Sequence, residues 1–288
     1  MMVIVDEAHG AHLGLSDKLP MTALEQGADI VVQSTHKTLP SFTQSSMIHI
    51  QGERVNQERL TSILRMIESS SPSYMLMSSL ELAVDIYETK GKDLMDELLD
   101  NIDIFKKNME KYKNINIYND DDRTKIFISS KELGMTGYEL DEMLRMNYNV
   151  QVELSNYYGI LLICTIGNDR GDFKSLEYAL ADISLNHISN KNIGYIDYPM
   201  NIPVKELSPR EAFYNEKKSV KIYDSIGKIC GEYIIPYPPG ICLVSPGEII
   251  TKEVIDYILV CHQKGMSISG MKDPSLGYIQ IIENSYNG

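Results

Sequence analysis

Two polar segments of this sequence each follow a short apolar run, and they hold the side chains best suited to chemistry. Asp6 directly follows residues 3–5 (VIV), and Ser34 to Lys37 (STHK) directly follow residues 29–33 (DIVVQ). Apolar, β-branched runs of this length are typical of strands in a parallel sheet that is covered on both faces. Ligands of open α/β sheets bind beyond the carboxyl ends of the strands, so both segments would reach one site.

A lysine and an aspartate placed in this way suit a carbonyl cofactor. A lysine amine can form a Schiff base with a carbonyl group. An aspartate beside a pyridine ring keeps its nitrogen protonated, and the positive ring accepts electrons when a bond at the substrate α-carbon breaks. We therefore interpret Lys37 as a Schiff-base lysine and Asp6 as the partner of a ring nitrogen. Spacing alone leaves open that Lys37 is a solvated loop residue and that Asp6 caps a strand end.

The elements that would position these segments belong to the first of three regions, residues 1–88. A third apolar run, residues 46–50, could continue the sheet, and Pro72 interrupts a serine-rich loop. Two helices are predicted, because apolar residues recur on one helix face in each. Their apolar positions are Leu60, Ile63, Leu64 and Ile67 in the first helix, and Leu80, Ala83, Val84 and Tyr87 in the second.

The second region, residues 89–195, mixes helices with strands. Its first helix would run through residues 94–105 and its last through residues 173–183, with strand-like runs at 124–128, 150–153 and 160–166. This order predicts a small α+β domain with an antiparallel sheet. The third region, residues 196–288, is rich in proline and contains one clear helical segment at residues 253–262. We therefore expect an α/β protein with two further α+β domains.

Composition excludes several classes of partner. The formal net charge is -13 and the isoelectric point is about 4.9, so a phosphate-neutralising surface for nucleic acid is not expected. An acidic protein can attract cationic small molecules over long range. No apolar run is long enough to cross a membrane, and residues 1–5 lack the basic start of a signal peptide. We expect a cytoplasmic protein, and the four cysteines show no zinc or disulfide spacing.

Longer stretches of the chain carry a resemblance to one family. The stretches VIVDEAHGAHLG and GADIVVQSTHKTLPSFTQSSMIHI come first, and Ser34 to Lys37 with Leu39 and Gln44 resemble a cofactor-attachment signature. SSSPSYMLMSSLE, QVEL with LLICTIGN, PREAF and YIIPYPPGICLVSPGE follow in the family's order. Together they resemble the major-class Orn/Lys/Arg decarboxylases, fold-type-I enzymes that depend on pyridoxal 5'-phosphate (PLP). The nearest likeness is to arginine and lysine decarboxylases of the Gram-positive type.

The resemblance implies a fold and a reaction. Residues 1–88 would be the C-terminal part of a PLP-binding large domain of the aspartate aminotransferase-like transferases. Residues 89–195 would be the small α+β domain, and residues 196–288 the C-terminal decarboxylase domain. The reaction implied is α-decarboxylation of arginine, lysine or ornithine to a polyamine precursor and CO2, in a homo-oligomer.

The resemblance also implies roles by position. Lys37 would hold PLP as an internal aldimine, Asp6 would pair with the pyridine nitrogen, and Ala8 would pack beneath the ring. Ser34 and His36 would bind the phosphate, which needs hydroxyl or charged donors. His9 would face the cofactor or substrate as a catalytic residue, while a surface or core imidazole is the alternative for His9 and still more for His12. No metal is expected.

The sequence departs from the family before Asp6. Relatives carry a long segment ahead of this strand, which supplies further strands of the sheet, a phosphate-binding turn and a side chain that stacks on the ring. We therefore expect an N-terminally truncated chain whose sheet has an exposed edge and an uncovered apolar face. The missing part could come from a separate N-terminal polypeptide, or the chain could be a fragment or a split gene product. Alone, it would bind PLP poorly and be inactive.

Other functions were weighed against this one. Asp6 to His9 (DEAH) also spells a helicase motif, but the phosphate-binding loop that a helicase needs is absent. A metal hydrolase could be built from His9, His12 and His36 with Asp6 or Glu7, but the spacing does not suit a helical zinc site. An aminotransferase of the same fold would need an arginine clamp, for which Arg123 and Arg170 are candidates. An inactive partner or regulatory subunit is the alternative outside enzymology.

Overall fold

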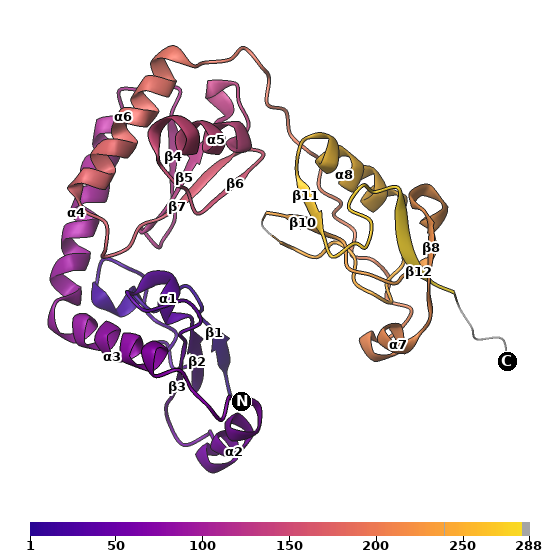
Figure 1. Cartoon of the computed structure of the whole chain (residues 1–288), viewed down its shortest axis with the longest axis horizontal. Helices are drawn as coiled ribbons and strands as arrows, with labels where there is room; N and C mark the ends of the chain where they lie inside the picture. The colour runs from indigo at the N-terminus through magenta and orange to yellow at the C-terminus, as the bar shows by residue number, and fades with distance from the viewer. Residues whose placement is uncertain (239, 284–288) are drawn as a thin grey trace. The chain divides into compact units, whose positions relative to one another are not determined.

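The computed structural model describes residues 1–238 and 240–283, except for the side chain of residue 119 (Figure 1). The chain forms two compact units. Unit 1 comprises residues 1–133, 143–153 and 161–188, and unit 2 comprises residues 134–142, 154–160 and 189 onward. The division into domains at residues 88 and 195 stays a prediction.

Unit 1 begins with a three-stranded sheet in the order β1-β2-β3. β1 (Ile4–Asp6) runs parallel to β2 (Ile30–Gln33), and β3 (Met47–Ile50) is antiparallel to β2. The three strands are where the sequence predicts them, but the sheet is mixed rather than parallel. The reason is the short connection from β2 to β3, which holds one single-turn helix, α1 (Thr35–Thr38), whereas parallel strands need a long crossover.

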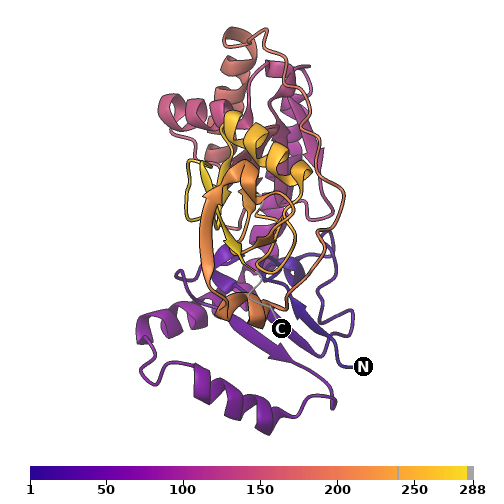
Figure 2. The same cartoon turned by 90° about the vertical axis from the view of Figure 1, so that its right-hand side faces the viewer.

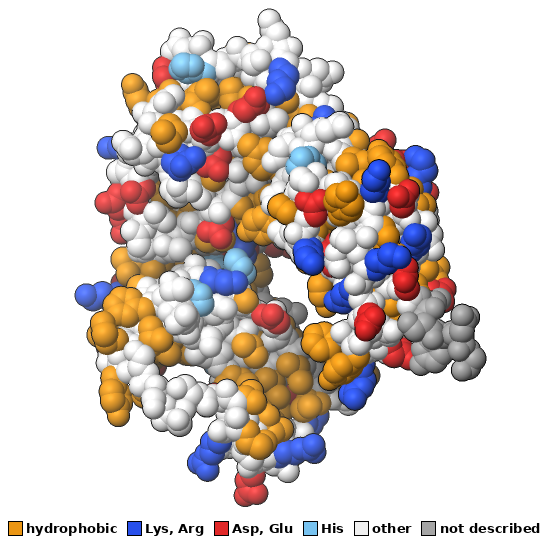
Figure 3. Space-filling view, turned by 45° about the vertical axis from the view of Figure 1, so that its right-hand side comes forward, with side chains coloured by type: hydrophobic (Ala, Val, Ile, Leu, Met, Phe, Trp, Pro, Cys, Tyr) orange, Lys and Arg blue, Asp and Glu red, His pale blue; other side chains and the backbone are white. Residues whose placement is uncertain are grey.

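The two faces of this sheet differ sharply. On one face Val31 is fully buried against Ala23 and Ala28. On the other face Ile4 is 61% exposed, and β1 pairs with β2 alone among the described strands. This arrangement confirms the predicted uncovered apolar face and free edge. Hydrophobic side chains are visible over this part of unit 1 in the lower half of Figure 3. The exposed face also includes Val32, Ile48 and Ile50.

Three helices follow the sheet. α2 (Gln57–Ile67) and α3 (Tyr74–Thr89) start at Asn56 and Ser73, whose side chains accept a hydrogen bond from the first turn, as good N-caps do. α2 has the predicted apolar stripe, yet buries none of it among the described residues. α4 (Gly91–Met109) buries Leu98, Ile102 and Phe105 of its predicted stripe, while Leu94 is half-buried. Its core residues include Met95, Leu98, Leu99, Ile102 and Phe105.

A four-stranded sheet in the order β4-β5-β7-β6 follows α4. Phe105 of α4 packs on Phe173 of α6, with ring centroids 6.0 Å apart. The predicted strand at residues 150–153 is wrong: that stretch is irregular and β6 starts at Leu154, because only isolated backbone bonds such as Glu153 N–H to Leu161 O form earlier. The bounds are β4 Asn116–Asn119, β5 Lys125–Ser129, η2 Lys131–Leu133, α5 Gly137–Tyr148, β6 Leu154–Asn156, β7 Gly159–Ile163 and α6 Arg170–Asn186.

Most of unit 2 lies in the C-terminal region. Its sheets are β8-β12-β9, which is antiparallel, and the antiparallel pair β10-β11 (Figures 1 and 2). The predicted helix at residues 253–262 is confirmed as α8 (Lys252–Gln263), which buries Ile255, Ile258 and Cys261. The other bounds are α7 Pro209–Tyr214, β8 Lys217–Lys221, η3 Ile222–Ser225, β9 Ile229–Cys230, β10 Ile235–Tyr237, β11 Ser267–Ser269 and β12 Tyr278–Ile282.

None of the helices in the described ranges combines the length and apolar character that a membrane span requires.

Candidate active site

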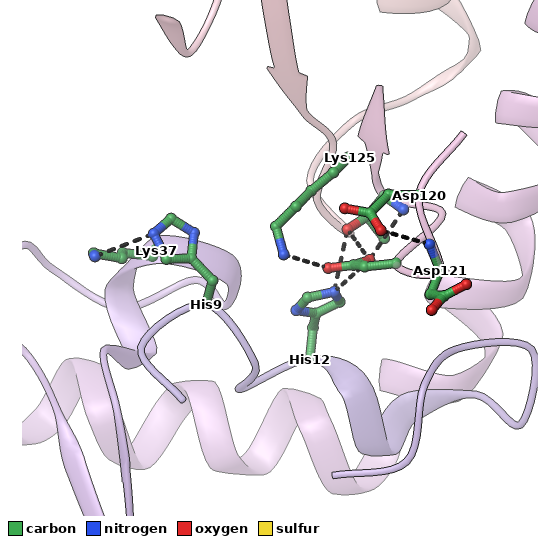
Figure 4. Close-up of polar contacts among 8 residues, drawn as sticks. His9, His12, Lys37, Asp120, Asp121 and Lys125 are labelled. Carbon is green, nitrogen blue, oxygen red and sulfur yellow. Dashed lines mark hydrogen bonds and ion pairs between the residues drawn. The ribbon is translucent and has the colours of Figure 1, made fainter. Parts of the chain in front are cut away.

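The segments that follow β1 and β2 meet at one edge of the first sheet. In the parallel pair, Asp6 lies opposite Val32, so both strands end at the same level. Beyond them the Nζ atom of Lys37 lies 3.2 Å from Nε2 of His9 (Figure 4). The structure therefore brings together the two polar segments that the sequence singles out.

A tight turn orients the Asp6 carboxylate. Oδ1 of Asp6 accepts a hydrogen bond from the backbone N–H of Ala8 at 3.0 Å. The Glu7 N–H donates to Val32 O at 2.9 Å, which extends the strand pairing by one residue. The second oxygen of Asp6 has no hydrogen-bond donor among the described residues, and the side chain is exposed. That oxygen is therefore available to a ligand at the strand end.

Glu7 points to the opposite face and has a structural role. Its Oε1 accepts from the backbone N–H of Ala23 at 2.7 Å, and its Oε2 accepts from Nε2 of Gln33 at 2.6 Å. A Cβ atom on Gly10 would lie 2.3 Å from Cγ of Glu7, so the glycine makes room for this side chain. Sequence reasoning treated Glu7 only as a possible metal ligand. The alternation of side chains along a strand was the signal that separates Glu7 from Asp6.

Ser34 and His36 flank the start of the single-turn helix that carries Lys37. The side chain of Ser34 makes no capping hydrogen bond. Nδ1 of His36 donates to the backbone oxygen of Ser45 at 2.6 Å, which leaves its Nε2 directed elsewhere. Both side chains are half-buried. The structure thus places the Ser34 hydroxyl and the oriented imidazole of His36 at the start of the turn that carries Lys37.

The surroundings of His9 favour its neutral form. Its pKa is lowered, first by burial and then by the positive charges of Lys37 and Lys125; Glu153 and Asp122 oppose these effects. The Nδ1 atom is buried and has no hydrogen-bond partner among the described residues. His9 therefore faces Lys37, and its lowered pKa favours the neutral ring; the sequence alone left the surroundings of His9 undecided.

A buried polar cluster lies beside this site. His12 is 2% exposed, and its Nε2 donates to Oδ1 of Asp122 at 3.2 Å. The Thr124 hydroxyl donates to the same oxygen at 2.6 Å, and Nζ of Lys125 lies 2.6 Å from Oδ2 (Figure 4). Burial alone would raise the pKa of Asp122, but hydrogen bonds from His12, Lys125 and Thr124 lower it well below the usual range.

This cluster was missed by sequence reasoning, which interpreted His12 as an ordinary surface or core imidazole. His12 is in the core and is paired. Its partner Asp122 lies 110 residues further along the chain, and no local pattern links the two. The cluster ties the segment that contains Asp6 and His9 to the start of β5.

The two arginines that could form a substrate clamp each lie beside a carboxylate. Nη2 of Arg123 lies 2.5 Å from Oδ1 of Asp103, and Nη1 of Arg170 lies 3.3 Å from Oε1 of Glu177. Both arginines thus form ion pairs with nearby carboxylates of the chain. Among the described residues, no three side chains of metal-ligating type converge.

Comparison with known proteins places the chain in a family. The profile of the Orn/Lys/Arg decarboxylase major domain matches residues 1–127, and that of the Orn/Lys/Arg decarboxylase C-terminal domain matches residues 197–284. The chain belongs to the Orn/Lys/Arg decarboxylase family. This membership excludes the helicase and metal-hydrolase interpretations of residues 6–9.

Curated relatives agree with this assignment. The chain is 35% identical to the arginine decarboxylase of Bacillus subtilis (strain 168), covering 98% of this chain and 60% of that protein. It is 36% identical to the arginine decarboxylase of Halalkalibacterium halodurans, with the same coverage of each. The chain thus spans about 60% of the length of these relatives.

Solved structures confirm the fold class. Lysine decarboxylase A from Pseudomonas aeruginosa superposes with a TM-score of 0.78 at 18% identity, over 98% of this chain and 53% of that one. The lysine decarboxylase of Francisella novicida gives a TM-score of 0.72 at 21% identity, over 88% of this chain and 49% of that one. The predicted α/β fold of these decarboxylases is therefore confirmed.

Proposed function

We propose that this chain provides the lysine-bearing part of a PLP-dependent α-decarboxylase of a basic amino acid, with arginine as the first candidate. The reaction would give a polyamine precursor and CO2. The observation that carries the proposal is the meeting of Lys37 with the Asp6–His9 segment at one sheet edge, in a chain of the Orn/Lys/Arg decarboxylase family. Arginine is preferred over lysine and ornithine because the relatives at 35–36% identity are named arginine decarboxylases.

The side chains present fit PLP. Lys37 offers an exposed amine, and one carboxylate oxygen of Asp6 has no donor among the described residues. Ser34 and His36 offer the hydroxyl and the imidazole that a phosphate group needs. Ala8 supplies a small apolar side chain in the turn between Asp6 and His9.

When bound, PLP supplies the electron sink for the pair of electrons released as the carboxylate leaves. The residues of the chain prepare the site for it. Asp6 would keep a proton on the ring nitrogen, Lys37 would hold the carbonyl carbon, and Ser34 and His36 would orient the phosphate. A decarboxylase leaves the substrate carboxylate unclamped, in agreement with the ion pairs that engage Arg123 and Arg170.

We also propose how the exposed part of the sheet is covered. In the complete enzyme the uncovered apolar face and the free edge of β1 would be covered by further strands of the same domain. The complete enzyme would be a cytoplasmic homo-oligomer. Within the chain, residues 1–88, 89–195 and 196–288 would be the remnant of the PLP-binding domain, the small domain and the C-terminal domain.

The test is PLP binding followed by borohydride reduction. Because the chain alone is expected to bind PLP poorly, we expect it to develop only a weak visible absorbance band with excess PLP, which reduction fixes on Lys37, as located by peptide mass spectrometry. Lys37→Ala should not develop it. A band of equal size in the Lys37→Ala variant would contradict the cofactor role of Lys37. A chain that binds PLP on Lys37 without releasing CO2 from arginine, lysine or ornithine would favour an inactive or partner-dependent subunit.

A further inference from the structure

The donor and the acceptor in the hydrogen bond between His9 and Lys37 can be assigned. A lysine ammonium has three donors and no acceptor, so Nε2 of His9 must accept the hydrogen bond at 3.2 Å. A neutral imidazole that accepts at Nε2 carries its proton on Nδ1. The contact is therefore possible only while His9 is neutral and in the Nδ1–H tautomer.

We propose that His9 is a positioning residue for Lys37: as a neutral acceptor it holds the lysine amine at the sheet edge, and on protonation it releases it. This inference rests on the proposed function, because the importance of the Lys37 amine comes from there. A protonated imidazole would present an N–H donor to another donor, so the hydrogen bond would be replaced by repulsion between two positive charges.

The charges around His9 determine when this happens. Burial, Lys37 and Lys125 disfavour protonation, in this order, whereas Glu153 and Asp122 favour it. These groups come from α1, from β5 and its preceding turn, and from the segment before β6. The balance lowers the pKa of His9 below its ordinary value, so the ring remains neutral and able to accept at neutral pH.

The structure shows why the Lys37 amine needs a residue that holds it in place. Lys37 is exposed, and His9 is its only hydrogen-bond partner through Nζ within the described part of the chain. A lysine side chain loses much rotamer freedom when it is held in one place, so without the contact the amine would sample many positions. A carbonyl group arriving at the sheet edge would then meet the amine less often.

The first experiment needs no cofactor. The protonation midpoint of His9 is measured from its ring signals by NMR, assigned through their loss in a His9→Gln variant. We expect Lys37→Met to raise the midpoint, Lys125→Met to raise it less, and Glu153→Gln to lower it. The charge-matched control Lys174→Met, at an exposed position of α6, should leave it unchanged. A midpoint that is the same in the Lys37→Met variant as in the parent chain would overturn the inference.

The second experiment distinguishes positioning from folding. The amount of PLP fixed on Lys37 by borohydride is measured against pH at subsaturating PLP. In the parent chain we expect several-fold less trapping below the His9 midpoint than above it. His9→Gln keeps an acceptor that does not titrate, so it should trap as the parent does at neutral pH and lack the acid step. His9→Leu should trap several-fold less throughout, with an unchanged circular dichroism spectrum.

The outcomes separate the two proposals. If the His9 midpoint shifts in Lys37→Met but no PLP is trapped on Lys37, the proposed function is contradicted. The contact between His9 and Lys37 would still be supported. Trapping on Lys37 with identical pH profiles for the parent chain and His9→Gln would overturn the positioning role alone.

Discussion

The buried carboxylate of Asp122 allows a quantitative test of the cluster beside the site. In the Asp122→Asn variant the side-chain volume is kept, but the charge that faces Lys125 and His12 is lost, and the amide NH2 group meets one of these donors. Hydrogen bonds to a charged group contribute about 1.5–3 kcal/mol each, and breaking a buried ion pair costs about 3–5 kcal/mol. The Lys125 side chain is 23% exposed, and Thr124 can still donate to the amide oxygen. We therefore expect a loss of about 3 kcal/mol in the free energy of unfolding of unit 1.

The matched control is Asp121→Asn, which removes the same charge one residue earlier at an exposed position. Its effect should stay within about 0.5 kcal/mol. Because the chain has two units, global unfolding does not isolate this region, so we would measure hydrogen exchange of the β5 amides (Lys125–Ser129) in the native state. Equal exchange rates in the two variants would refute the reasoning.

The same variant has a pH signature. The pKa of Asp122 is lower in the folded chain than in the unfolded one, because its donors outweigh the effect of burial. Its contribution is therefore fully present above the unfolded value of about 3.9 and is lost as pH falls towards the folded value. We expect the difference between the parent chain and Asp122→Asn to be constant near neutral pH and to shrink below about pH 4. A difference that grows on acidification would contradict the direction of the pKa shift.

Three further predictions concern other parts of the chain. Phe105→Ala should lower the free energy of unfolding of unit 1 by about 3–5 kcal/mol, measured by native-state hydrogen exchange, because the ring is fully buried. Gly10→Ala should cost about 1–3 kcal/mol by the same assay, since the new methyl group meets Glu7; no change would show that Glu7 moves freely. Burial raises the pKa of the Cys230 thiol to about 12, whereas Cys242 is exposed, so iodoacetamide at mildly alkaline pH should label Cys242 first, as seen by mass spectrometry.

What the sequence could reveal depended on the range of the interactions. The face of α4 and the strand ends at Asp6 and Lys37 are local patterns, and all were predictable. β4 was missed because its four residues hold only two apolar side chains, next to each other, so neither an apolar run nor alternation marks it. The direction of β3 depends on how much chain connects it to β2, which hydrophobicity does not encode. The pairing of His12 with Asp122 depends on the fold as a whole.

The segment from Asp6 to His12 divides its residues between function and support. His9 lies against Lys37 and Asp6 has an oxygen without a donor among the described residues, whereas Glu7 and His12 are anchored to the protein on other sides. A side chain that binds a ligand needs polar atoms that are not already hydrogen-bonded within the protein. The neighbouring residues therefore make the hydrogen bonds that hold this segment in place. Loss of an anchor should therefore displace the functional residues without removing them. For this reason, the His9 midpoint in Asp122→Asn should change by more than the loss of one distant charge explains, and Glu153→Gln gives the scale for such a charge effect.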